Sequence, residues 1–178
     1  IMLYILEAVP LSVFLVFIKH INQAVPMAWK EPFLVSGTLA LGIIFFLFYK
    51  KHWFNRLFLG INLYLITGGL AFITGQYWLN QSYGHLQASG MLIWIILTGL
   101  VTLFLSPAGF IGVTSGAGQP AVRRYSVFLL CVTAGAFLIS FTFKGSHLLS
   151  EIIPYTVLFI AQAILRRRCT QEIEKQPV

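Results

Sequence analysis

Near its start the chain carries the stretch EAVPLSVFLVFIK, which runs from Glu7 to Lys19. It opens with an acid, has Pro10 three residues on, and then carries no further charge before the lysine. At about 1.5 Å of rise per residue, a helix from Met2 to Lys19 would be roughly 26 Å long, just enough to cross the hydrocarbon core of a bilayer. The stretch therefore predicts a first transmembrane helix.

Five further apolar runs follow this first one, so the pattern predicts six helices. Backbone polar groups inside lipid need hydrogen-bond partners within their own segment, and helices provide them. We expect an all-α polytopic transmembrane bundle of six helices, forming a single domain over residues 1–178 and ending in a short polar tail at 169–178. The expected segments are 2–19, 33–49, 57–74, 88–105, 126–143 and 148–165.

The composition separates this chain from ordinary soluble proteins. Of its 178 residues 58% are hydrophobic and 10% are charged, whereas soluble globular proteins carry about 25% charged residues. Membrane lipids are therefore the expected surroundings. The net charge of +7 comes from basic residues between and after the apolar runs, which favours anionic lipid head groups and speaks against nucleic acid as a partner.

The basic residues also predict the orientation of the bundle. Six crossings put the N-terminus, the second and fourth connections and the C-terminal tail on one side, and Lys and Arg gather on the cytoplasmic side of membrane proteins. Nine basic residues fall on that side and three on the other, so we expect both termini in the cytoplasm of a multi-pass inner-membrane protein. The nine are Lys50, Lys51, Arg56, Arg123, Arg124, Arg166, Arg167, Arg168 and Lys175, and the three are Lys19, Lys30 and Lys144. Among the nine, those expected to contact lipid head groups are Arg123, Arg124, Arg166, Arg167 and Arg168.

Glu7 and Glu151 are the only acids inside the expected segments. Each is followed three residues later by a proline, and both acids and prolines favour the first turn of a helix. Capping the start of its own helix is the simpler interpretation for each. The functional alternative is an ion pair, of Glu7 with Arg56 or Arg123 on the cytoplasmic side, and of Glu151 with Lys144 or Lys19 on the other side.

The third segment is the most polar of the six. Asn62, Gly69 and Gln76 recur every seven residues, which places them on roughly one helix face. Small residues such as Gly68 and Gly69 let helices approach closely, and side-chain amides form hydrogen bonds between helices. We interpret this segment as the central packing helix, and a polar path through the bundle is the alternative.

Two connections have marked compositions. The connection at 106–125 is rich in glycine but lacks the Gly-Lys-Ser/Thr sequence of a phosphate-binding loop, so we expect a flexible cytoplasmic loop. The connection at 75–87 has no Lys, Arg or Glu, and its aromatic residues are expected at the outer membrane interface. These are Tyr77, Trp78 and Tyr83.

The residues that could carry chemistry are few. No two histidines have the i, i+4 spacing of a helical zinc site, and none lies in the middle of a segment where haem would be buried. The chain has no Asp for a catalytic triad and no Gly-x-Ser-x-Gly sequence. We expect no metal, cofactor or catalytic residue and favour a protein that is not an enzyme. An enzyme acting on lipids stays open, with Glu151 or His147 as base and Arg123 and Arg124 holding a head group.

Two motifs are formed by Glu7, Pro10, Leu11, Phe14, Phe17 and Lys19 in the first segment, and by Gly68, Gly69, Leu70 and Phe72 in the third. They resemble motifs of the intracellular septation protein A family of bacterial inner-membrane proteins. The spacing of the six segments and the chain length also fit, so the resemblance covers nearly the whole chain. Different sequences stand at 84–87 and 121–125, where the fourth and fifth segments begin, which would make the chain a distant member.

The resemblance implies a small polytopic inner-membrane protein with a role in cell division and envelope maintenance. It implies no known catalytic residue and no cofactor, so such a protein would act by holding envelope or division proteins. We therefore expect a non-enzymatic membrane protein that binds partners. The alternative is a small transporter or channel with a polar path along the third helix. Its candidate residues are Asn62, Thr67, Gly69 and Gln76 along the path, with Glu7 and Glu151 near opposite ends.

Overall fold

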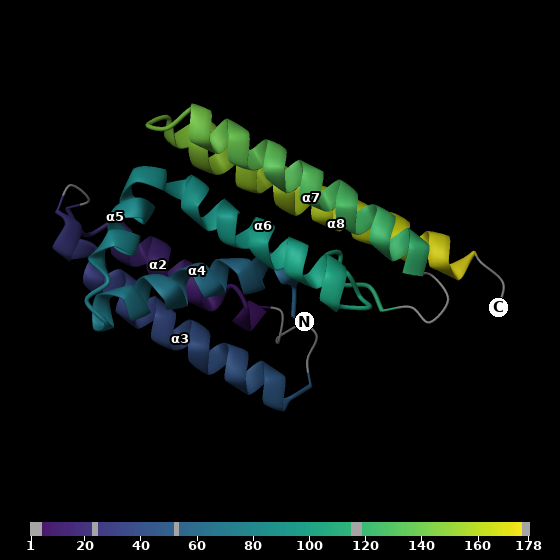
Figure 1. Ribbon diagram of the computed structural model, residues 1–178, viewed down its shortest axis with the longest axis horizontal. Coiled ribbons are helices and arrows are strands. Elements are labelled where there is room, and N and C mark those ends of the chain that lie inside the picture. The colour runs from purple at the N-terminus through teal and green to yellow at the C-terminus, as the bar shows by residue number, and fades with distance from the viewer. Residues whose placement is uncertain (1–4, 23–24, 52–53, 115–118, 176–178) are drawn as a thin grey trace. The chain divides into compact units, whose positions relative to one another are not determined.

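The computed structural model describes residues 5–22, 25–51, 54–114 and 119–175. Every regular element within these ranges is helical (Figure 1). The elements are α2 (Val9–Ile18), η1 (Pro26–Trp29), α3 (Lys30–Tyr49), α4 (Arg56–Ile73), α5 (Tyr77–Leu86), α6 (Ala88–Leu105), α7 (Gln119–Thr142), η2 (Leu148–Ile152) and α8 (Ile153–Glu174).

Five helices in the described ranges are long and apolar enough to cross a membrane. The helical structure confirms the expected all-α class, and five helices of this length and apolar character suggest a multi-pass membrane protein. The five helical stretches are Met27–Tyr49, Arg56–Ile73, Ala88–Leu105, Pro120–Thr142 and Leu148–Glu174. Where a single domain was expected, the chain divides into two compact units, Ile1–Met91 and Leu92–Val178.

The first expected segment is not one continuous helix. The backbone turns at Glu7 and Ala8, and α2 then spans only ten residues, Val9–Ile18, or about 15 Å. Pro10 explains the interruption, because proline has no N–H to bond the carbonyl of Leu6 and its ring would clash with that carbonyl. The described part of this segment is therefore too short to cross a membrane as a regular helix.

In the first unit, α3 and α4 form the main packing interface, with α2 against α3 (Figure 1). Glycines allow the two backbones to approach closely. A Cβ atom added at Gly37 would lie 2.8 Å from the carbonyl oxygen of Leu65, and one added at Gly69 would lie 2.9 Å from that of Phe33. The helix α4 is the most buried of the five, which fits the interpretation of the third segment as a packing helix.

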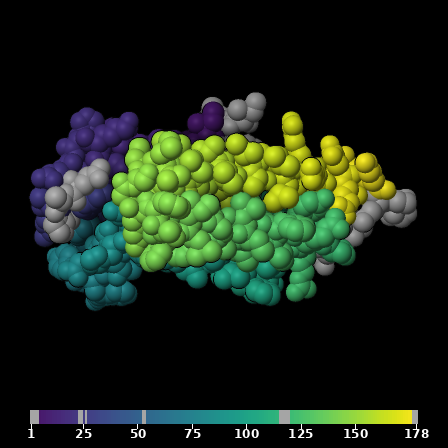
Figure 2. All heavy atoms as spheres, turned by 90° about the horizontal axis from the view of Figure 1, so that it is seen from above, coloured from purple at the N-terminus to yellow at the C-terminus, as the bar shows by residue number. Residues whose placement is uncertain are grey.

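In the second unit, α7 and α8 lie side by side as an antiparallel pair (Figure 2). A widened turn at Leu148–Ile152 precedes α8. Pro154 cannot donate to the carbonyl of Ser150 four residues earlier, and the hydroxyl of Ser140 on α7 donates to that carbonyl instead, at 2.6 Å. The hydrogen bond between the helices thus replaces the one that proline removes.

Both helices of this pair exceed their expected bounds. The helix α7 begins at Gln119 rather than near residue 126, so Arg123 and Arg124 lie on a helix and not in a loop. The helix α8 continues to Glu174, which replaces most of the expected polar tail at 169–178; residues 176–178 lie outside the described ranges. Cys169, in these additional turns, is fully buried.

The connection after α6 is packed rather than flexible over residues 106–114. Ala108, Phe110 and Ile111 are buried, and the backbone N–H of Ile111 donates to the hydroxyl of Ser126 on α7 at 3.1 Å. Gly109 has φ +58 and lies so close to Ser126 that a Cβ atom would overlap its hydroxyl. The expected flexible loop is therefore wrong for this part, and residues 115–118 lie outside the described ranges.

Candidate functional site

A buried polar cluster joins the start of α2 to the start of α4. The side chain of Glu7 is fully buried, and its Oε2 accepts the backbone N–H of Asn55 at 3.1 Å. Asn55 is the N-cap residue of α4 and accepts the N–H of Leu57 with its own side chain at 3.0 Å. The carboxylate of Glu7 thus lies at the N-terminus of α4, where a negative charge stabilises the helix dipole.

The same carboxylate attracts the guanidinium of Arg56, which is only 8% exposed. Arg56 also donates from Nη1 to the carbonyl of Phe54 at 3.0 Å. The side-chain N–H of Asn62 reaches the backbone carbonyl of Glu7 at 3.4 Å. Of the two interpretations for Glu7, the contact with Arg56 is the one that the geometry supports. The N-cap residue of α2 is Ala8, whose side chain accepts no capping hydrogen bond, and Glu7 lies just before it, outside the first turn of the helix.

An aromatic cluster surrounds Phe33 at the centre of the first unit. Its ring centroid lies 5.0 Å from that of Phe14, 5.5 Å from that of Tyr64 and 6.1 Å from that of Tyr83. Gly68 lies directly under this ring, so that an added Cβ atom would be 2.3 Å from the nearest ring carbon. The position of Gly68 and Gly69 is therefore explained by close packing against a large aromatic residue.

The polar side chains of α4 are used inside the unit. Thr67 shares a hydrogen bond of 2.8 Å with the hydroxyl of Tyr83 on α5. Tyr83 is buried, whereas Tyr77 and Trp78 are exposed. The connection that contains them forms the helix α5, so its aromatic residues point in different directions.

Gln76 does not belong to the face formed by Asn62 and Gly69. The helix α4 ends at Ile73, and Gly75 follows with φ +70 while the N–H of Gln76 donates to the carbonyl of Ala71 at 2.8 Å. This is the Schellman arrangement that glycine favours at helix ends. Gln76 is exposed and accepts a hydrogen bond from the indole N–H of Trp78 at 2.8 Å.

The remaining candidates of the apolar segments lie apart from this cluster. Pro10 is buried in the first turn of α2, and Lys19 is exposed at its C-terminal end. Glu151 lies in the turn before α8, where its Oε2 is 2.5 Å from Nδ1 of His147. Its partner is thus a histidine of the same turn, not a lysine of another connection.

The arginines at the start of α7 have different environments. Nη2 of Arg124 lies 2.5 Å from Oε2 of Glu172 on α8, which also accepts the hydroxyl of Tyr125 at 3.0 Å. Arg123 is exposed and has no ion-pair partner in the part of the chain that the structure describes. Arg166, Arg167 and Arg168 are exposed on α8.

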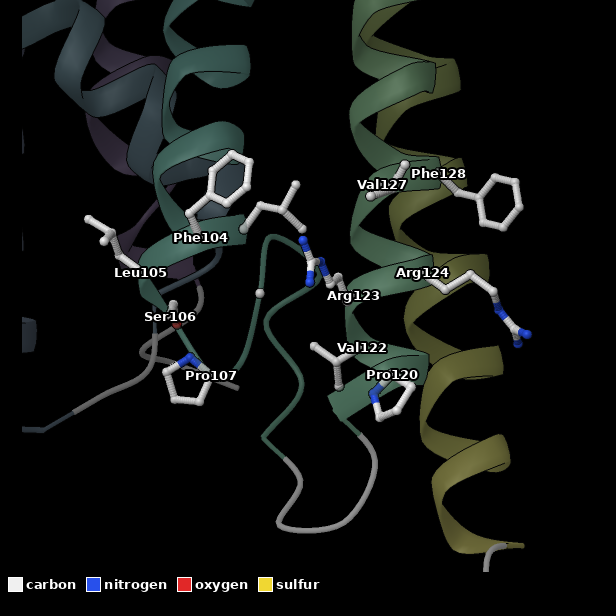
Figure 3. Close-up of a pocket in the computed structure, with 12 residues that line it drawn as sticks. Phe104, Leu105, Ser106, Pro107, Pro120, Val122, Arg123, Arg124, Val127 and Phe128 are labelled. Carbon is white, nitrogen blue, oxygen red and sulfur yellow. The ribbon is translucent and has the colours of Figure 1, made fainter.

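An open groove of about 930 Å³ lies beside Arg123 (Figure 3). One wall is the end of α6 and the turn after it, residues 103–107, and the other is the first turns of α7, residues 120–128. Figure 3 shows Arg123 pointing across this gap towards α6, whereas Arg124 points away from it over α8. Within 5–22, 25–51, 54–114 and 119–175, no three His, Cys, Asp or Glu residues gather as metal ligands would.

Sequence reasoning did not single out Phe33, Asn55 or Glu172. A signal existed for Asn55, because an asparagine just before an apolar run is a typical helix N-cap. Nothing near Phe33 or Glu172 in the sequence reveals partners that lie 31 to 50 residues away. Comparison with protein-family models, with curated proteins and with solved structures gave no match to this chain.

Proposed function

We propose that this chain is a multi-pass protein of the bacterial inner membrane that supports cell division or envelope maintenance by binding partner proteins. In this proposal six segments cross the membrane, and both termini lie in the cytoplasm. Support for the division role comes from the resemblance to the intracellular septation protein A family around Pro10, Gly68 and Gly69.

The observation that carries the proposal is the close packing of α4. A single methyl group added at Gly68 would overlap the ring of Phe33, and one added at Gly69 would press on the Phe33 backbone. A transporter needs a cavity near the midplane of the membrane, beside interrupted helices. A packed centre of this kind favours a protein that holds others in place over one that moves solutes.

Two polar residues of the alternative function, a path through the bundle, form hydrogen bonds within the protein. Asn62 bonds the backbone of Glu7, and Gln76 bonds Trp78 outside α4. These contacts give both residues roles in local structure. They leave the partner-binding function as the better supported of the two candidates.

Photo-crosslinking in living cells tests the proposal. A benzophenone amino acid would replace Phe45 on α3, which is 75% exposed, or Leu138 on α7, which is 61% exposed. The proposal expects a discrete protein adduct from one of these positions, identified by mass spectrometry as a division or envelope protein. Adducts with lipid alone from both positions would contradict it.

A strain that lacks the gene provides a second, independent test of the division role. Loss of the gene is expected to lengthen cells or to make the envelope leaky to periplasmic enzymes, and the intact gene should restore both. Cells of normal length with a tight envelope would count against the division role. Such a result would not argue against the membrane fold.

A further inference from the structure

The groove beside Arg123 combines an apolar wall with a cation at one end. Phe104 and Leu105 on α6 are 70% and 80% exposed, and Val127 on α7 is 42% exposed. These side chains line the groove near the C-terminal end of α6 and the N-terminal end of α7. Arg123 points across the groove (Figure 3). Apolar side chains next to an arginine at a helix end are typical of the boundary between hydrocarbon and head groups.

The two arginines at this groove, Arg123 and Arg124, differ in whether they have an ion-pair partner. Glu172 on α8 neutralises Arg124 at 2.5 Å. Arg123 lacks such a partner among the described residues, and its guanidinium can give two parallel hydrogen bonds to one phosphate group. An anionic ligand with an apolar tail would therefore satisfy both halves of the groove.

We propose that this groove binds one anionic phospholipid, with its phosphate on Arg123 and an acyl chain against Phe104, Leu105 and Val127. This site goes beyond the partner-binding role proposed above and does not depend on it. It also differs from a general attraction of basic residues to lipid head groups. It assigns a bound lipid to Arg123 and none to the exposed arginines of α8.

Native mass spectrometry of the intact, detergent-purified chain tests the site, with phosphatidylglycerol as the titrated probe. Arg123→Gln removes the phosphate contact, and the matched control Arg166→Gln removes an equal charge from an exposed position on α8. A hydrogen bond to a charged group contributes about 1.5–3 kcal/mol, so Arg123→Gln should weaken the tightest lipid binding roughly tenfold or more. Arg166→Gln should leave it within about twofold.

A second pair of variants probes the apolar half of the groove without touching a charge. Leu105→Ala should weaken phosphatidylglycerol binding several-fold, whereas Leu138→Ala, an equally small change at another exposed leucine, should not. Circular dichroism and gel filtration will show whether Arg123→Gln folds. If it does not, the two leucine variants are sufficient to test the proposal. Both leucines are exposed, so neither change is expected to disturb packing.

Three outcomes would overturn the proposal. Equal weakening by Arg123→Gln and Arg166→Gln would mean that only the total charge attracts the lipid. Equal binding by Leu105→Ala and the unchanged protein would mean that the groove holds no acyl chain. Displacement of the lipid by inorganic phosphate at the same concentration would mean that the site recognises phosphate and not a phospholipid.

Discussion

Gly68→Ala is expected to destabilise the first unit even though alanine is the better helix former. The added methyl group would lie 2.3 Å from a ring carbon of Phe33, whereas carbon atoms prefer separations of about 3.5–4.0 Å. The ring therefore has to move by more than about 1 Å. It has no obvious direction to move in, since the rings of Phe14, Tyr64 and Tyr83 surround it with centroids 5.0, 5.5 and 6.1 Å away.

Overpacking of this kind costs about 1–3 kcal/mol of unfolding free energy. The matched control is Gly42→Ala on α3, because nothing lies within 4 Å of a Cβ atom at Gly42. That change should keep the gain of roughly 0.5–1 kcal/mol that alanine brings to a helix interior. For a protein of this size, 1 kcal/mol corresponds to a shift of about 2–4 °C in the melting temperature.

Heating the detergent-purified variants and measuring the folded fraction by gel filtration compares the two. Gly68→Ala should melt several degrees below Gly42→Ala. In a Phe33→Leu background the same glycine change should cost less than half as much, because the smaller side chain leaves room for the methyl group. Equal melting of Gly68→Ala and Gly42→Ala would refute the close packing of α3 on α4.

Three further changes separate buried from exposed polar contacts by the same melting measurement. Glu7→Gln leaves the guanidinium of Arg56 buried without its counter-charge and should cost about 3–5 kcal/mol; a loss below about 1 kcal/mol would contradict a buried charge pair. Asn62→Ala should cost about 1–3 kcal/mol, because it leaves the Glu7 carbonyl without this donor, whereas Gln76→Ala should be near neutral; equal effects would show that both amides have the same role. Glu172→Gln should cost no more than about 1 kcal/mol, since its pair with α7 is partly exposed, and a larger loss would mean that this contact holds α7 and α8 together.

Hydrophobicity located the long helices but not α5, which forms within an expected connection. The expected segment at 88–105 coincides with α6, α3 begins three residues before its segment, and α4 is shifted by one residue towards the N-terminus. The reason is physical, since a backbone in lipid has to be helical wherever the side chains are continuously apolar. The start of α7 was missed because its first turns carry Arg123 and Arg124, although Pro120 in the first turn was a local signal for a helix start.

The contacts that join the helices were much harder to predict. For Glu7, an ion pair with Arg56 or Arg123 was the alternative to capping, because few charges are present and all three lie near segment ends; the structure places Glu7 beside Arg56. The meeting of Phe33 with Tyr83 depends on α5 folding back onto α3 and α4, and no periodicity within either segment reports it. Pro10 does lie in the first turn of a helix, as interpreted, but the interruption at Glu7 was missed because the segment from Met2 to Lys19 was assumed to be one continuous helix.

The side of the membrane on which the chain ends is the most direct test of this account. A dual reporter fused after Val178 would combine alkaline phosphatase, active only in the periplasm, with a fluorescent protein that matures only in the cytoplasm. Six crossings with the arginine-bearing ends inside predict bright fluorescence and no phosphatase activity. Phosphatase activity without fluorescence would contradict the proposed topology, and with it the position of Arg123 at the inner leaflet.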